Sequence, residues 1–450
     1  MIAAARPMRE SSEWSTSGVV AWWRAHSWLP IVFVLVLWAI MPEVRRLIDW
    51  RIGFNYIAVA SIVPLLALVP FAVLVLYRDY TKLPRPIVLC AWLWVGGFGY
   101  AFAVGVTAGN GLAAIYAGLN FLLPMFFGLW VATLDVVPEE LCERVASIAL
   151  WIAAPIALYA VFQYVALPDW DAAWMRNTGL VSIGNPAPFQ FRPFSTLNSP
   201  GPLGDFLVAV LLLNLPRLRR FSALQLAQIV LLVGTLVLTM VRSSWLAAIV
   251  GVFTYLLMSP NRAKNLAIVS LVGIVCAMLV LNVAGLLGSD QAGSDLAQRF
   301  QTLGNLQSDS SYNVRQEYFG YKLQTALSQP TGAGLGLLGT AAKLGSTAQV
   351  VDFDNGYIAR LTEMGYFGTL CYVATLIAAL VLSWRYWDAA RRRGNAHEAA
   401  FGAAVFALQL TLAATDISSD HHNQFSGIFF WLSLALVCSR RERPRSAAHR

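Results

Sequence analysis

The sequence predicts an all-helical integral membrane protein with about twelve transmembrane helices. Of its 450 residues, 58% are hydrophobic and only 12% are charged. A soluble globular protein carries roughly 25% charged residues, so this chain has too few charges to solvate a surface. Apolar runs recur along the whole chain, and a run of about 20 residues is long enough to cross a hydrocarbon core roughly 30 Å thick. The surface that lacks charge must therefore face lipid.

The apolar runs place the twelve expected spans. They lie at 28–43, 56–77, 87–108, 112–134, 145–166, 201–215, 222–241, 244–258, 264–287, 357–382, 399–416 and 424–439. The run from 222 to 258 is long enough for two spans and divides near Arg242. Residues 1–27 are polar, and no small-residue cleavage site follows the first run, so we expect that run to be retained as a span.

Positive charge sets the expected orientation of the spans, because Lys and Arg are retained on the cytoplasmic side. With residues 1–27 in the cytoplasm, five of the six loops and tails on that side carry the Lys and Arg excess. The tail 440–450 is then cytoplasmic as well. The net charge of +8 reflects this topology. We expect no nucleic-acid partner, since no soluble domain carries a basic patch with interleaved aromatic residues.

This orientation divides the chain into membrane and exterior parts. Residues 28–287 hold spans 1 to 9, with an exterior loop at 167–200. Residues 288–356 form the main extramembrane domain, and 357–439 hold spans 10 to 12. Within the large loop, 311–327 reads as an amphipathic helix, which Pro330 and the glycine-rich residues after it terminate.

Several classes of site find no support in the sequence. The five cysteines form no CxxC pair, so we expect neither a disulfide framework nor a zinc site. No phosphate-loop, dinucleotide-binding or zinc-protease motif occurs, which argues against ATP-driven transport. We therefore predict no metal and no cofactor.

Arginines on the exterior side are the first candidate site residues. An arginine at the edge of hydrocarbon is costly unless it is paired or hydrated, which marks it as functional by default. Its planar fork can bind two phosphate oxygens at once, so the cluster predicts a site for a lipid-linked phosphate or pyrophosphate. The alternative is that the side chains reach lipid headgroups or pair with carboxylates. The arginines are Arg45, Arg46 and Arg51 in an exterior loop 44–55, then Arg192, Arg242, Arg299, Arg315 and Arg360.

Polar residues at the start of span 10 are the second group. Asp354 or Asn355 can cap the helix that follows, because both accept hydrogen bonds from free N–H groups at a helix start. Arg360 and Glu363 are three residues apart, a spacing that allows an ion pair on one helix face. A structural role for that pair and a role in the site remain open at this point.

The turn between the last two expected spans contains His421 and His422 beside Asp416 and Asp420. Adjacent histidines point to different faces of a helix, and no HxxxH spacing exists, so we do not expect a metal site. Hydrogen-bonded loop residues are one interpretation of the histidines, and assistance in proton transfer is the other.

Four segments, in order along the chain, resemble the O-antigen ligase and Wzy-type polysaccharide polymerase family. The first is 192–200, similar to the family's Arg-x-x-(Gly/Ser)-Thr-x-x-Asn-Pro stretch before a span. The second is 241–245, similar to its arginine-bearing pattern at a span boundary. The resemblance covers roughly 185–375, and about twelve spans agree with the family over the rest of the chain.

The third and fourth segments lie around the large loop. The third joins 299–300 and 311–315 to 330–336, similar to an arginine-bearing helix before Pro-x-x-Gly-x-Gly. The fourth joins 354–358 to 363–368, similar to (His/Asp)-Asn-x-Tyr-Leu-x-x-x-x-Glu-x-Gly-x-x-Gly. Their order, spacing and exterior placement make the combination more specific than any one motif.

The resemblance implies a GT-C-like, metal-independent, inverting glycosyltransferase at the periplasmic face of the bacterial inner membrane. The donor and acceptor would be oligosaccharides linked to undecaprenyl pyrophosphate, in contact with the lipid bilayer and with chain-length regulator or flippase proteins as further partners. Arginines would hold the pyrophosphate and stabilise its developing charge. The implied catalytic residues are Asp354, Glu363 and Arg242. The implied substrate-binding residues are Arg192, Arg242, Arg315, Arg299, Asn355, Tyr357, Arg360, His421 and His422.

One departure from the family pattern bears on the reaction. The ligases carry a histidine just before the asparagine of the fourth segment, where this chain has Asp354. This difference favours a polymerase, whose acceptor is a second lipid-linked repeat unit, over a ligase that uses lipid A-core. A secondary transporter or flippase is the alternative of a different class. It would need ionisable residues at mid-membrane, whereas the candidates here gather at the exterior edge.

Overall fold

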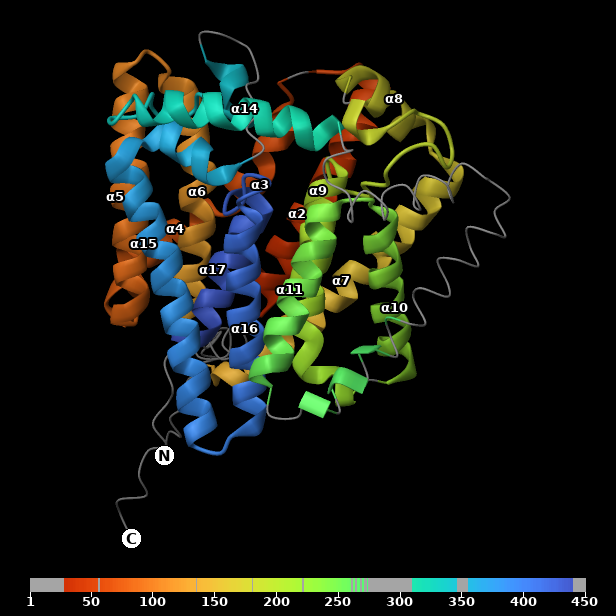
Figure 1. Cartoon of the computed structure of the whole chain (residues 1–450), viewed down its shortest axis with the longest axis vertical. Helices are drawn as coiled ribbons and strands as arrows, with labels where there is room; N and C mark the ends of the chain where they lie inside the picture. Colours follow the sequence, from red (N-terminus) through yellow and green to blue (C-terminus); the bar gives the residue numbers. More distant parts are fainter. Residues whose placement is uncertain are drawn as a thin grey trace, which may run out of the picture.

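All regular elements in the described part of the computed structural model are helices (Figure 1). That part comprises 28–259 without 56, 135, 180 and 221, then 262, 263, 265–267, 269, 270 and 273, and finally 310–345 and 355–439. For residues 181, 219, 220 and 310–318 only the backbone is described.

Seven helical segments of the described chain are long and apolar enough to cross a membrane. They are the run Val59–Lys82, α5 (Arg85–Thr107), α6 (Gly111–Ala132), α7 (Pro138–Ala166), α9 (Pro200–Asn214) with the 3-10 turn after it (Leu215–Arg220), α15 (Gly356–Arg392) and α16 (Ala396–Thr415). Three shorter apolar helices accompany them: α10 (Ala223–Leu238), α11 (Arg242–Met258) and α17 (Gln424–Cys438). Each overlaps a predicted span, and the all-α integral membrane class is confirmed. The predicted span 264–287 lies almost wholly outside the described residues.

The first helix is longer than the sequence predicted. We expected it to end at 43, with Arg45 and Arg46 in an exterior loop 44–55. Instead α2 (Leu29–Ile52) continues to Ile52, so this part of the prediction is wrong. Arg45 pairs with Asp49 at 3.3 Å, one turn further on, and Arg46 pairs with Glu43, three residues before it. Residues that signalled a loop by their charge thus neutralise one another along a helix.

The run Val59–Lys82 is a chain of short helical pieces. It comprises a 3-10 turn (Val59–Ile62), α3 (Val63–Leu66), α4 (Val69–Leu74), a π turn (Val75–Asp79) and a second 3-10 turn (Tyr80–Lys82). Pro64 and Pro70 are the second residues of α3 and α4. Proline lacks a backbone N–H, so each interrupts the hydrogen-bond ladder and starts a new helix.

α17 lies at the centre of the bundle. It packs against α6, α16, α15 and α9, and its residues from Ile428 to Leu436 are buried. Trp431 and Phe430 stack around Trp94 of α5, with ring centroids 5.6 and 5.9 Å from it. Large apolar side chains such as Phe253 and Leu370 point outward instead. Because an aqueous surface rarely exposes such a large apolar area, the outer faces of these helices are lipid-facing.

The two ends of the bundle differ. At one end, uppermost in Figure 1, lie α8 (Asp169–Thr178) and α14 (Ser310–Leu327), which runs across the bundle. We call this the α14 end. The large loop therefore contains a helix over the predicted range. The turn from α15 to α16, with Arg391 and Arg392, lies at the opposite end (Figure 1).

α15 is divided in two. Gly365 has φ 59° and ψ −165°, far from helical values, so a short segment precedes it and a long one follows. The short segment lies beneath α14 and at an angle to the rest of α15 (Figure 1). A glycine is needed here, since a side chain at Gly365 would meet the backbone of Pro330 and Thr331 at 2.3 to 2.4 Å.

Candidate functional site

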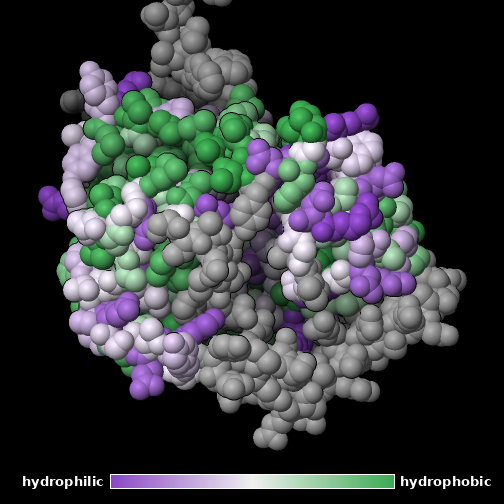
Figure 2. All heavy atoms as spheres, turned by 90° about the horizontal axis from the view of Figure 1, so that it is seen from above, coloured by the Kyte–Doolittle hydropathy of each residue, from purple (hydrophilic) through white to green (hydrophobic). Residues whose placement is uncertain are grey.

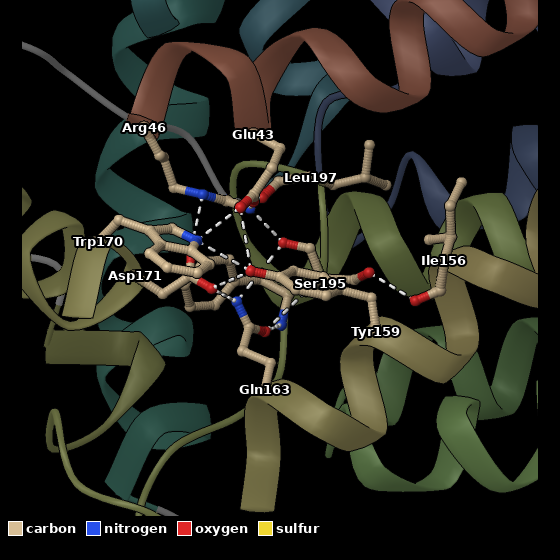
Figure 3. Close-up of polar contacts among 10 residues, drawn as sticks. Glu43, Arg46, Ile156, Tyr159, Gln163, Trp170, Asp171, Ser195 and Leu197 are labelled. Carbon is tan, nitrogen blue, oxygen red and sulfur yellow. Dashed lines mark hydrogen bonds and ion pairs between the residues drawn. The ribbon is translucent and has the colours of Figure 1, made fainter. Parts of the chain in front are cut away.

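The turn that precedes α9 is held by a buried polar cluster (Figure 3). Arg46 of α2 is 1% exposed, and its Nε lies 2.8 Å from Oδ1 of Asp171 in α8. The same guanidinium pairs with Glu43 and donates to the backbone carbonyls of Ser195 and Leu197. A buried cation is tolerated when it is paired and hydrogen-bonded in this way. The cluster fixes the turn against α2 and α8.

Gln163 of α7 holds the same turn from the other side (Figure 3). Its Nε2 donates to Oδ2 of Asp171 at 2.8 Å, and its Oε1 accepts from the backbone N–H groups of Phe194 (3.0 Å) and Ser195 (2.8 Å). The Ser195 hydroxyl donates to the carbonyl of Ile156 at 2.6 Å. Ser195 adopts φ 54°, an uncommon conformation that these bonds stabilise. The first family-like segment is thus clamped in place.

One of the predicted arginines, Arg192, contacts the turn that leads to another, Arg242. Arg192 Nε donates to the carbonyl of Thr239 at 3.0 Å, and its Nη1 donates to that of Ser182 at 3.1 Å. Thr239 begins the turn between α10 and α11, and Arg242 is the first residue of α11. We call this turn, with Arg192 and Arg242, the arginine turn. It joins segments that are about fifty residues apart in the sequence.

Glu363 anchors the glycine-rich loop that follows α14. Its Oε1 accepts from the backbone N–H groups of Gly336 and Leu338, each at 3.1 Å, and its carbonyl accepts from Gly334 at 3.0 Å. Gly336 has φ 91°, and a Cβ there would lie 2.4 Å from the carbonyl carbon of Ala113 in α6. The glutamate and glycines of the third and fourth segments therefore form one interlocked unit.

Arg360 closes this unit beneath α14. Its Nη1 lies 3.0 Å from Oε2 of Glu363, so the predicted ion pair is present. Its Nη2 bonds Oδ2 of Asp420 at 2.9 Å, and the guanidinium stacks over Phe121 of α6 at 4.6 Å. Arg360 is 2% exposed. Two carboxylates therefore balance its charge inside the protein. Burial raises the pKa of Asp420, an effect that Arg360 opposes.

The start of α15 is capped as expected. The Asn355 side chain accepts from the N–H of Ile358 at 3.0 Å, so the predicted cap is confirmed for this residue. The Tyr357 hydroxyl donates to the carbonyl of Ala413 at 2.6 Å, and Gly356 N–H donates to that of Asp416 at 2.7 Å. The start of α15 is thereby tied to the end of α16.

His422 is a buried structural centre. Its Nδ1 lies 3.1 Å from Oδ2 of Asp416 and 3.0 Å from the hydroxyl of Tyr372, which itself donates to Asp416. The side chain is fully buried and its backbone has φ 67°. Burial alone would raise the pKa of Asp416, but His422, His421 and Tyr372 together lower it below its ordinary value. The predicted proximity of histidines and aspartates in this turn is therefore present.

His421 connects the same turn to α9 and α11. Its Nδ1 lies 3.4 Å from Oδ2 of Asp205, and Oδ1 of Asp205 accepts from the Ser244 hydroxyl at 3.2 Å. Ser244 is two residues beyond Arg242 on α11. The arginine turn and the turn that contains His421 and His422 thus share a polar connection through α9.

A cavity of about 210 Å³ opens among α2, α6 and the turn before α9. Figure 2 looks onto the α14 end and shows hydrophilic atoms within a hollow of this face. The cavity is lined by Trp38, Met41, Pro42, Arg45, Ile57, Ala58, Ala60, Ser61, Ile62, Pro64, Tyr116, Asn120, Leu197, Asn198, Pro202, Thr340, Lys343, Leu344, Gln424 and Phe425.

Two of these lining residues, Arg45 and Lys343, are cations, and none of the described lining residues is an aspartate or glutamate. Burial lowers the pKa of Lys343, and the nearby charge of Arg45 lowers it further. Arg45 also pairs with Asp49, which is not one of the lining residues.

Residues 227–373 match the family model described as O-antigen ligase. The match covers about a third of the chain, and we call residues 227–373 the O-antigen ligase domain after the description of that model. The domain includes α10, α11, α14, the glycine-rich loop and the start of α15, so the resemblance found in the sequence is confirmed there. Arg242 and Glu363 lie inside the O-antigen ligase domain, whereas Arg192 lies before it. No curated protein matches the chain.

The O-antigen ligase domain implies a membrane enzyme that transfers glycans, with lipid-linked glycans as substrates. Its remaining predicted site residues are described only in part. Arg299 and Asp354 lie outside the described residues, and Arg315 lies on α14, of which only the backbone is described there. Within the described residues, no three side chains of His, Cys, Asp or Glu come together as a metal site.

Some residues around the O-antigen ligase domain were missed by the sequence analysis. Lys343, Asn120 and Asn198 line the cavity, and Asp205 bridges two turns. Asn120 was detectable as an amide inside an apolar run, where a polar group must find a partner or face a cavity. Lys343 gave no signal, since it follows the glycine-rich loop in a stretch without periodicity.

Proposed function

We propose that the protein polymerises oligosaccharide repeat units carried on undecaprenyl pyrophosphate, for an O-antigen, a capsule or an exopolysaccharide. A hydroxyl of the acceptor glycan attacks the anomeric carbon of the donor glycan. The new glycosidic bond forms as the bond from that carbon to the pyrophosphate oxygen breaks. Undecaprenyl pyrophosphate leaves, the hydroxyl proton passes to a base, and the single displacement inverts the anomeric centre.

The arginine turn is the observation that carries this proposal. A departing pyrophosphate gains negative charge, and fixed cations at that point stabilise the transition state more than the ground state. Arg192 contacts the carbonyl of Thr239, three residues before Arg242, so the backbone segments that carry the two cations meet at this turn. In the proposal Arg192 and Arg242 bind the pyrophosphate, and Arg299 and Arg315 of the large loop complete its binding site.

The acceptor side of the proposed site lies at the start of α15. Asp354 directly precedes the Asn355 cap and is our proposed base for the acceptor hydroxyl. Glu363 shapes that side through its bonds to the glycine-rich loop. Asn355, Tyr357, Arg360, His421 and His422 hold the surrounding turns, through which they position the groups that meet substrate.

The proposed site faces the periplasm. Arg391 and Arg392 lie at the end of the bundle opposite α14, and cytoplasmic loops are enriched in such residues. The α14 end is then periplasmic, and both chain termini are cytoplasmic. The large loop between spans 9 and 10 of twelve would then cover the reaction from the periplasmic side.

A second candidate is the ligation of a finished glycan to lipid A-core. The description of the matching family model as O-antigen ligase favours it. Donor and chemistry are the same in both candidates, and only the acceptor differs. Asp354, in place of the histidine of the ligases, keeps polymerisation as our first choice.

The test uses the purified full chain with lipid-linked repeat units as the only glycan. Polymerisation lengthens these units, whereas a ligase leaves them unchanged until lipid A-core is added. Arg242→Ala should lower the rate by about 100-fold or more, because a fixed cation is lost from the leaving group. Arg392→Ala, an exposed arginine at the opposite end, should keep the parental rate. Unchanged chain length with Arg242→Ala would remove Arg242 from the mechanism.

A further inference from the structure

The carboxylate of Asp205 joins two turns that the proposed reaction needs. It lies on α9, between the start of α11, where Arg242 is the first residue, and the turn that contains His421. We propose that Asp205 is a positioning residue: acting through Ser244, it holds Arg242 where negative charge develops on the departing pyrophosphate. This inference rests on the proposed function, because it adds a residue to the reaction proposed above.

Both oxygens of the Asp205 carboxylate have a partner. Oδ1 accepts a hydrogen bond from the Ser244 hydroxyl at 3.2 Å, and Oδ2 lies 3.4 Å from Nδ1 of His421. The Asp205 side chain is only 14% exposed, although the other residues of α9 from Leu203 to Leu213 are apolar. An ionisable residue inside an apolar helix is costly and is a functional candidate by default. Its two partners therefore indicate which parts of the molecule the carboxylate serves.

α9 and α11 approach each other closely at this point. Gly204 precedes Asp205, and a Cβ on this glycine would lie 2.5 Å from the hydroxyl oxygen of Ser244 and 2.8 Å from its Cβ. A glycine at a helix contact allows the two backbones to come together. Ser244 itself is fully buried. The hydrogen bond from Ser244 to Asp205 thus forms within a tight contact, which leaves the start of α11 little room to shift.

The first turn of α11 is held by side chains that reach its neighbours. Val241, the residue before Arg242, provides no side-chain cap for the helix. The Nε1 of Trp245 donates to the carbonyl of Leu236 in α10 at 2.9 Å, and the Ser244 hydroxyl donates to α9 as described. These two bonds tie the turn to α10 and to α9. Loss of the bond to α9 would let the turn move, and Arg242 would move with it.

The position of Arg242 matters because of what the proposed reaction asks of it. A cation lowers the barrier most when it is already fixed near the oxygen on which charge develops. A misplacement of about 1 Å can lower a rate by roughly 100-fold. An interaction that is stronger in the transition state than in the ground state lowers kcat when it is lost, with little change in KM. We therefore expect changes at Asp205 to act mainly on kcat.

His421 connects Asp205 to the acceptor side of the proposed site. The residue before it, Asp420, accepts from Nη2 of Arg360 at 2.9 Å, and Arg360 in turn pairs with Glu363. Glu363 holds the glycine-rich loop. The acceptor attacks in the same step in which the pyrophosphate leaves, so both sides must be aligned at once. Asp205 contacts the turns on both sides, which suits a positioning residue.

The experiment measures kcat and KM for the elongation of lipid-linked repeat units by the full chain in nanodiscs. Asp205→Ala should lower kcat by about 10- to 100-fold and change KM by no more than about threefold. Asp205→Asn keeps an oxygen that accepts from Ser244, so it should recover kcat to within about fivefold of the parent. Ser244→Ala keeps the Cβ that packs on Gly204 and loses only the hydroxyl, so kcat should fall by about tenfold.

A double-mutant cycle with Arg242→Ala tests whether Asp205 acts through that arginine. Adding Asp205→Ala to Arg242→Ala should lower kcat by no more than about twofold further, because the cation that Asp205 positions is already absent. Asn214→Ala is the matched control. Asn214 is a fully buried residue at the other end of α9, and its Nδ2 donates to the carbonyl of Ala146 in α7 at 2.9 Å. This variant should lower the midpoint of thermal unfolding and keep the parental kcat.

Equal losses of kcat from Asp205→Ala with and without Arg242 would overturn the inference, and so would a parental kcat in the folded Asp205→Ala variant. An Asp205→Asn variant as slow as Asp205→Ala would overturn the route through Ser244. Should Asp205→Ala fail to fold, Ser244→Ala passes through the same cycle with the same criteria.

The outcomes also separate this inference from the proposed function. Elongation by the parent, with independent losses in the cycle, rejects this inference alone. A parent that transfers glycan only to lipid A-core rejects polymerisation, and the cycle is then measured in that reaction. Transfer to neither acceptor rejects the proposed function and this inference with it.

Discussion

Arg45 and Arg46 are neighbours on α2, yet they belong to two different environments. Arg46 is buried among Glu43, Asp171 and two backbone carbonyls, all from the protein itself. Arg45 is partly exposed and lines a cavity that it shares with Lys343. A cation enclosed by two carboxylates of the protein holds structure, whereas Arg45 pairs with Asp49 and still lines the cavity.

The same contrast divides the other arginines. Arg360 resembles Arg46, because Glu363 and Asp420 balance its charge. Arg192 also donates to the backbone carbonyls of Thr239 and Ser182, and these bonds orient its guanidinium at the arginine turn.

The largest effect on stability should come from Arg46→Met, which removes the cation from the buried cluster around Arg46. It leaves Glu43 and Asp171 buried without their cation, and loss of one partner of a buried pair costs about 3–5 kcal/mol. We expect the folded protein to be lost or its thermal transition to fall sharply, as measured by tryptophan fluorescence in detergent. Arg391→Met, on an exposed side chain, should leave the transition in place. Unfolding of both variants at the parental temperature would show that the cluster in Figure 3 does not hold the turn.

A substitution in the glycine-rich loop should displace the wall of the cavity. Gly336→Ala places a Cβ against the backbone of α6 and also strains a positive φ, so we expect a loss of about 2–3 kcal/mol. Gly339→Ala is the matched control, because Gly339 also has a positive φ but no atom within 4 Å of the new Cβ. It should cost only about 1 kcal/mol. Equal losses in unfolding experiments would mean that the close contact with α6 is unimportant.

The enclosed cluster should also respond to pH. Burial and the nearby Glu43 raise the pKa of Asp171 to about 6, although Arg46 opposes this. The folded protein then binds the proton more tightly than an unfolded chain, whose aspartate has a pKa of about 3.9. This contribution to stability is complete below pH 4 and is lost as the pH rises to about 6, by up to about 1.4 kcal/mol per pH unit. The Asp171→Asn variant lacks this pH-dependent contribution. The difference in unfolding free energy between the parent and the variant should therefore change between about pH 4 and about pH 6. Parallel pH curves would contradict the assignment.

The smallest effect on stability should come from Lys343→Gln, which changes a residue that lines the cavity. Removing one of two repelling cations should change the free energy of unfolding by no more than about 0.5 kcal/mol in either direction. The midpoint of thermal unfolding measures this. A loss as large as that of Arg46→Met would mean that Lys343 holds the fold.

The sequence predicted most of the fold because segments that cross lipid must be long and apolar. Long apolar runs located the described spans, and Asn355 and the Arg360–Glu363 spacing were predicted from helix geometry alone. The exception was α2, where charges were interpreted as a loop. Residues 44–52 are helical because their charges pair at intervals of three and four residues, a spacing that composition alone does not reveal.

The candidate site was less predictable, because it depends on contacts between distant segments. Nothing in the sequence around Gln163 or Asp171 indicated that both would hold the turn near Ser195. Charge alone also gave Arg45 and Arg46 the same interpretation, although one faces a cavity and the other does not. Only tertiary packing decides which arginine meets a carboxylate.

The break in α15 sets the level of its first residues relative to the bilayer. A straight helix of 37 residues would be about 55 Å long, nearly twice the hydrocarbon thickness of roughly 30 Å. With Gly365 as the break, Tyr366–Arg392 measures about 40 Å, close to the whole bilayer with its headgroups. Arg360 and Glu363 therefore lie at headgroup level, the level at which a polyprenyl carrier holds its phosphates.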